Sequence, residues 1–68
     1  MQIGIGTMLK GKINNRLLKV VKIENIKKWQ NGKIEEYITL KNVAPQKNEL
    51  KFIQVERKTF DRLLLEIV

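Results

Sequence analysis

Apolar and polar residues alternate along most of the chain, with a period closer to two than to the 3.6 residues of a helix. Because such alternation is typical of strands that bury one face, we expect a mostly β protein. The clearest turn is Asn31-Gly32, since both central residues of a type I′ hairpin turn need a positive φ angle. We therefore predict one long hairpin over residues 16–43, with a two-residue loop that places Trp29 opposite Ile34.

This hairpin separates its side chains into two faces. The face expected to point to the core is apolar and carries Leu17, Val21, Ile23, Ile34, Ile38 and Leu40. The face expected to meet water carries Lys22, Glu24, Lys28, Glu35, Tyr37, Thr39 and Lys41. Near its start, the first strand of the hairpin is apolar on both faces, which is typical of a bent strand shared by two sheets, as in a barrel.

The rest of the chain reads as short elements joined by turns. Asn14-Asn15 is a second turn candidate because Asn tolerates a positive φ angle, and Thr59 is a candidate cap for one helical turn. The expected order is a first strand over 3–13, the hairpin, a loop over 44–49, a fourth strand over 50–56, a helical turn over 60–63, and a last strand over 64–68. In the fourth strand, we expect Ile53 and Val55 to point inward.

Four strands, one helical turn and a fifth short strand form an order that resembles the Src-homology-3-like small β-barrel. The resemblance covers nearly the whole chain and rests on the order and length of the elements. It implies an all-β fold, a small five-stranded antiparallel barrel with one short helical turn before the last strand, in a single domain over residues 1–68. Barrels of this kind bind peptides, nucleic acids or ribosomes, so the resemblance by itself implies no one function.

The chain has few residues able to do chemistry. It contains no Cys, His or Ser, so it lacks the activated nucleophiles and the zinc ligands of most enzymes. Its few carboxylates are not spaced as a calcium or magnesium site. We expect a protein that is not an enzyme and holds no metal or cofactor. The lack of Cys, of a signal peptide and of any long apolar run favours a cytoplasmic location away from membranes.

Charge is the strongest functional signal, since 14 Lys and Arg against 7 Asp and Glu give a net charge of +7. Such a domain attracts anionic partners, although Lys also serves simply to keep a surface soluble. Our leading hypothesis is a small basic binding module for an anionic partner, most plausibly nucleic acid. The candidate binding residues are Lys10, Lys12, Arg16, Lys19, Lys22, Lys27, Lys28, Trp29, Lys33, Tyr37 and Lys41.

Two questions stay open from the sequence. Trp29, at the hairpin tip, could cover the core, contact a protein, or stack on a base. The protein could instead be a phage or mobile-element effector that inhibits a host nuclease or defence complex by protein–protein binding. Its small size and its apolar end, residues 63–68, favour that alternative. The same end could pair as an edge strand with a second copy, giving a homodimer.

Overall fold

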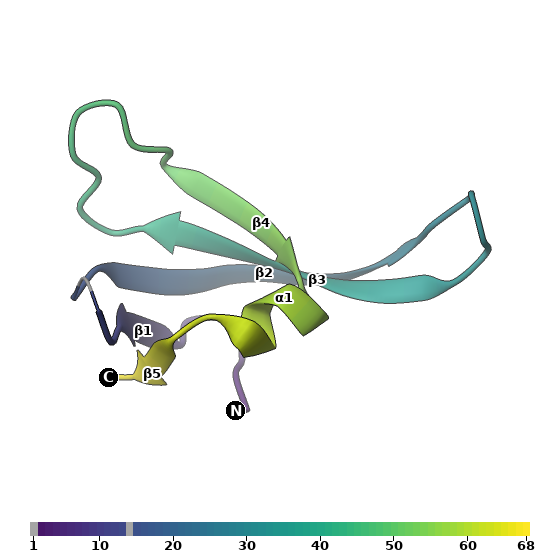
Figure 1. Ribbon diagram of the computed structural model, residues 1–68, viewed down its shortest axis with the longest axis horizontal. Helices are drawn as coiled ribbons and strands as arrows, with labels where there is room; N and C mark the ends of the chain where they lie inside the picture. Colours follow the sequence, from purple (N-terminus) through teal and green to yellow (C-terminus); the bar gives the residue numbers. More distant parts are fainter. Residues whose placement is uncertain (1, 14) are drawn as a thin grey trace.

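The computed structural model describes residues 2–13 and 15–68. Five antiparallel strands form one sheet in the order β4-β3-β2-β1-β5, as Figure 1 shows. One short helix, α1, lies between the last two strands, so the expected all-β class and the helical turn before the last strand are confirmed. The elements are β1 (Met8–Gly11), β2 (Leu17–Lys27), β3 (Ile34–Asn42), β4 (Phe52–Glu56), α1 (Arg57–Arg62) and β5 (Leu65–Ile67).

The sheet is open, and the expected closure into a barrel is wrong. Strands β4 and β5 form its two edges, and among the described residues no strand pairing joins them. After β4, the chain runs through α1 and Leu63-Leu64 to the far side of the sheet, where β5 pairs with β1 (Figure 1). Strand β5 consists of Leu65–Ile67 and pairs with β1, so that within the described part of the chain β4 has no partner on its outer side.

The hairpin of β2 and β3 has a four-residue loop, so the predicted two-residue loop is wrong. The amide of Lys28 donates to the carbonyl of Lys33 over 2.8 Å, and Lys27 pairs with Ile34. The amide of Gly32 then donates to the carbonyl of Lys28 over 2.7 Å. Gly32 has a φ of 69°, whereas Asn31 is not among the residues with positive φ, so the type I′ turn cannot form. Loops of this length are commonly built around a type I turn.

Compared with the predicted two-residue loop, the four-residue loop shifts the pairing of β2 with β3 by two residues. A shift of two keeps each side chain between the loop and Lys22 on its predicted face. A β-bulge at Val21 then slips the register by one more residue. Beyond the bulge the faces of β2 are exchanged: Val20 is fully buried and Leu18 packs against the core. The prediction that Leu17 points inward is therefore wrong, since Leu17 is exposed. Val21, which was also expected to point inward, is the extra residue of the bulge and is half-buried.

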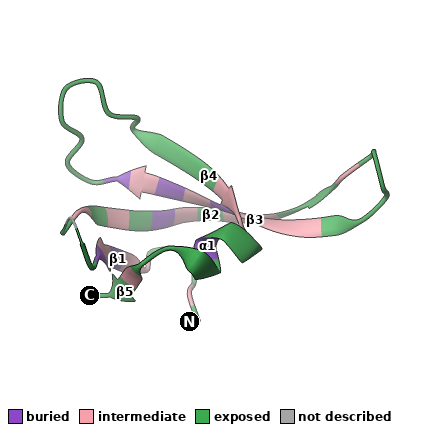
Figure 2. Ribbon diagram, viewed as in Figure 1, coloured by how far each residue is buried: buried purple, intermediate pink, exposed green. Residues whose placement is uncertain are grey.

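The core lies on the side of the sheet on which α1 packs (Figures 1 and 2), and we call this side the concave side. Its fully buried side chains come from four elements: Leu9, Val20, Ile38, Leu40 and Phe60. Ile38 and Leu40 were expected there, whereas Ile34, also expected inside, is 69% exposed because the hairpin extends beyond the core. The helix begins at Arg57, two residues before Thr59, so the predicted Thr cap is wrong.

The first strand is shorter than predicted because the chain turns before it. The amide of Thr7 donates to the carbonyl of Gly4 over 3.0 Å, and Gly6 adopts a φ of 96° in this turn. The turn between β1 and β2 is where we expected it: Asn15 has a φ of 57° and its amide donates to the carbonyl of Gly11. The other half of that prediction, Asn14, lies outside the described residues.

Candidate nucleic-acid interface

Ion pairs divide the basic side chains into two groups. Each of the seven carboxylate side chains lies within 4.0 Å of a Lys or Arg, and these pairs occupy six of the fourteen basic residues. The other eight have no such carboxylate among the described residues: Lys12, Lys19, Lys27, Lys33, Lys41, Lys47, Lys51 and Arg62. The positive charge available to a partner therefore concentrates on this second group.

One end of the convex face, which lies opposite the core, is neutralised by a network around Glu56. Lys28 Nζ lies 2.7 Å from Glu56 Oε1 and 3.4 Å from Glu35 Oε2. The hydroxyl of Tyr37 donates to the same Glu56 oxygen over 3.2 Å. The hydrogen bond from Lys28 is the main reason that the pKa of Glu56 falls to about 2. Lys28 and Tyr37, both predicted to bind a partner, thus interact within the protein.

These contacts also change the other two ionisable groups. The hydrogen bond to Glu56 raises the pKa of the Lys28 ammonium above its ordinary value, which keeps that group charged. Partial burial, followed by the hydrogen bond to Glu56, raises the pKa of Tyr37. This network therefore joins the residue after β2, strand β3 and the end of β4 through charge-assisted contacts.

The other end of the convex face is positively charged. Lys19 on β2 pairs with Lys41 on β3, and they are flanked by Met8 on β1 and Phe52 on β4. We call these four cross-strand neighbours the basic row. Lys51 adds a further charge, because its Nζ lies 5.9 Å from the centre of the Phe52 ring. Two Lys side chains facing each other repel, which an anion bound between them would relieve.

The Phe52 ring gives the basic row an aromatic surface, since this side chain is 52% exposed. Sequence analysis did not select Phe52 as a binding residue. The signal was present, because Ile53 and Val55 were expected to point inward and alternation places Phe52 on the opposite face, beside Lys51. An exposed ring beside Lys side chains offers stacking and charge together, which is the combination that single-stranded nucleic acids need.

Three other predicted binding residues have carboxylate partners. Lys10 Nζ lies 3.8 Å from Glu66, Arg16 lies 2.9 Å from Glu49, and Lys22 Nζ lies 3.3 Å from Glu24. Carboxylates therefore separate some of the predicted binding residues from one another. Of the predicted residues, the structure brings Lys19 and Lys41 directly together.

The hairpin tip holds a separate group of predicted residues. Trp29 is 92% exposed, so the interpretation that it covers the core is wrong. Lys27 and Lys33 lie beside it on the part of the hairpin that extends away from the core (Figure 1). Whether this tip contacts a partner stays a prediction, as it does for Lys12 in the turn after β1.

Over residues 2–13 and 15–68, no group of three or more acidic, Cys or His side chains is placed to hold a metal ion. No helix in the same part of the chain is both long and apolar enough to cross a membrane. In comparisons with known proteins, no protein-family model, no curated protein and no solved structure matches this chain.

Proposed function

We propose that this protein is a non-catalytic module that binds nucleic acid through the basic row. The observation that carries the proposal is the placement of Lys19 and Lys41 side by side, without a carboxylate partner among the described residues, next to the exposed ring of Phe52. The order of elements also supports our proposal that the fold belongs to the Src-homology-3-like class. The outer side of β4, which pairs with no strand in residues 2–13 and 15–68, is a departure from a closed barrel of that class.

In this proposal the basic row separates two tasks. The Lys19 and Lys41 ammonium groups contact successive phosphates, and a base stacks on Phe52. Only an unstacked base can reach the ring, so single strands bind more tightly than duplexes. The neutralised end of the convex face, around Glu56, contributes little to the attraction.

Fluorescence anisotropy with labelled single-stranded RNA, single-stranded DNA and a duplex of the same sequence tests the proposal. We expect the affinity for single strands to fall steeply between about 50 and about 200 mM salt, because phosphate contacts release counterions. The double variant Lys19→Glu/Lys41→Glu should abolish binding. Phe52→Ala should weaken single-strand binding by roughly 1–3 kcal/mol and leave duplex binding nearly unchanged.

The variant Lys47→Glu/Lys58→Glu is the matched control, because it changes the net charge equally at two exposed residues outside the basic row. It should retain most of the affinity. An equal loss of nucleic-acid affinity in the two double variants would show that the protein attracts nucleic acid through its net charge alone. The absence of binding to every probe at about 50 mM salt would disprove the proposal.

A further inference from the structure

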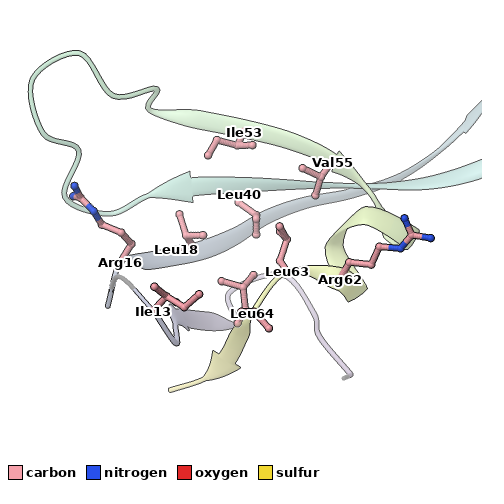
Figure 3. Close-up of a pocket in the computed structure, with 11 residues that line it drawn as sticks. Ile13, Arg16, Leu18, Leu40, Ile53, Val55, Arg62, Leu63 and Leu64 are labelled. Atoms are coloured by element: carbon pink, nitrogen blue, oxygen red, sulfur yellow. The ribbon is translucent and has the colours of Figure 1, made fainter.

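The concave side of the sheet carries a groove of about 520 Å³, and Figure 3 shows the residues that line it. The groove lies on the face opposite the basic row, because Leu40 and Ile53 line it while their strand neighbours Lys41 and Phe52 point to the other face. Leu40, Ile53 and Val55 line it from β3 and β4. Leu63 and Leu64, which follow α1, line it from the other side. Both walls are apolar, so an occupant that removes them from water gains hydrophobic stabilisation.

One wall of this groove is a free strand edge. Strand β4 pairs with β3 on one side, and among the described residues no strand pairs with its other side. Ile53 and Val55, two residues apart on β4, both face the groove. An extended chain laid along this edge can therefore form backbone hydrogen bonds with β4 while every second side chain enters the groove.

The charged residues that line the groove are both basic. Arg16 and Arg62 lie toward its two ends in Figure 3, and no carboxylate side chain lines it among the described residues. Arg16 already pairs with Glu49, whereas Arg62 has no carboxylate within 4.0 Å among those residues. A second copy of this chain would bring another net charge of +7 to the site, so charge favours an acidic occupant.

We propose that this groove binds one extended segment of an acidic protein. The segment pairs with the outer edge of β4, places apolar side chains at every second position against Ile53 and Leu64, and presents a carboxylate to Arg62. The site does not depend on nucleic-acid binding, because the basic row is on the other face of the sheet. The two proposals can therefore fail separately.

Two synthetic peptides with blocked ends test the site: Asp-Val-Thr-Val-Thr-Val-Asp, and the same sequence with Lys in place of both Asp. Titration into the isotope-labelled protein, followed by amide NMR spectra, should shift the signals of β4 and of residues 63–65. We expect the Lys-flanked peptide to bind roughly fivefold more weakly, which is the ratio given by about 1 kcal/mol.

Two variants locate the site, and both residues are exposed enough for the fold to tolerate the change. Arg62→Glu should reverse the preference between the two peptides. Leu64→Lys should remove binding of both peptides while the remaining amide signals stay in place. The variant Lys19→Glu/Lys41→Glu is the control on the other face, and it should leave the peptide affinity within about twofold, because mutations at distant sites act independently.

Five results would overturn this proposal. Three concern the peptides: no shifts at millimolar peptide, equal affinity for the two peptides, or shifts that map to the convex face. The other two show a different occupant: dodecanoate that shifts the groove signals where the peptides do not, or groove signals that change with protein concentration alone. Dodecanoate binding would assign the groove to a small amphiphile, and concentration dependence would assign it to a second copy.

Discussion

Phe60 has no exposed surface, whereas Trp29 keeps 92% of its surface exposed, although both are large aromatic residues. Phe60 lies in the one short helix, which packs on the concave side of the sheet, and it is part of the core. Trp29 lies in the loop of a hairpin that extends past that core. The two residues therefore differ in their effect on stability through their place in the fold, and not through their hydrophobicity.

Substitution of these two residues should separate their roles. Phe60→Leu should lower the free energy of unfolding by about 1–2 kcal/mol, because it leaves a space in a packed core. Trp29→Ala should change that free energy by less than about 0.5 kcal/mol, since the ring is exposed. Urea unfolding followed by circular dichroism measures both. A large loss of stability in Trp29→Ala would show that the ring packs on the protein in solution.

Glu56 should make stability depend on acid pH. Its pKa is lowered from 4.5 to about 2 in the folded protein, chiefly by the hydrogen bond from Lys28. It therefore contributes stability that is present above pH 4.5 and is lost as the pH falls toward 2. The variant Glu56→Gln should be less stable than the unmodified protein at neutral pH. Its unfolding free energy should also decrease less as the pH falls from 4.5 toward 2.

Thermal unfolding at several pH values checks this dependence on Glu56. The control is Glu66→Gln, which removes the same charge from an exposed pair whose atoms are 3.8 Å apart. Because such an exposed ion pair contributes little to stability, the stability of this variant should depend on acid pH as that of the unmodified protein does. If Glu56→Gln keeps that dependence as well, the network around Glu56 does not form in solution.

At the scale of the elements, the loop of the β2–β3 hairpin decides which residues face one another. Asn31-Gly32 did mark the correct turn, but the chain places only Gly32 at positive φ. The bulge at Val21 has a second effect, since it exchanges the faces of β2 and brings Lys19 opposite Lys41. The basic row therefore depends on an irregularity of one residue.

Gly32 should be the sensitive glycine of this hairpin. Its φ of 69° strains any residue with a Cβ, although a Cβ built there would meet no atom within 4 Å. Gly32→Ala should therefore cost about 1–2 kcal/mol through backbone strain alone. Gly4→Ala is the control, because Gly4 has equally open surroundings and no positive φ. Urea unfolding should show little or no loss in Gly4→Ala, and equal losses would contradict the strain argument.

At the scale of the whole molecule, the excess charge should make anions stabilise the fold. Any anion that binds the folded chain and not the unfolded chain raises stability, by about 1.4 kcal/mol at ten times its dissociation constant. Phosphate should therefore raise the melting temperature more than chloride of equal ionic strength. The gain should disappear in Lys19→Glu/Lys41→Glu and persist in Lys47→Glu/Lys58→Glu. If phosphate still raises the melting temperature of both variants, phosphate does not act at the basic row.

Much of the architecture was predictable because strands leave a local signature. Residues two apart share a face, so alternation located β3 and the inward side of β4 at Ile53 and Val55. Barrel closure was not predictable in this way. It depends on how far α1 and the residues after it carry the chain before β5 begins. With the length observed, no strand of the described chain pairs with the outer side of β4.

The candidate site was predictable only in part. Lys19 and Lys41 were both selected from the sequence, but so were Lys10 and Lys22, which have carboxylate partners. A list of Lys residues cannot show which of them are neutralised, because the ion pairs join residues far apart in the sequence, such as Lys28 and Glu56. Phe52 became a candidate once its position beside Lys41 was known.

By itself, the sequence determined the strand character, the positions of the turns, the short list of reactive residues and the net charge of +7, because each of these is local or additive. Only the tertiary structure decided the register, the open edge at β4 and the location of unneutralised charge. These features depend on which residues of neighbouring strands pair with each other. One positive φ angle in a loop and one bulged residue can shift that pairing by a whole position.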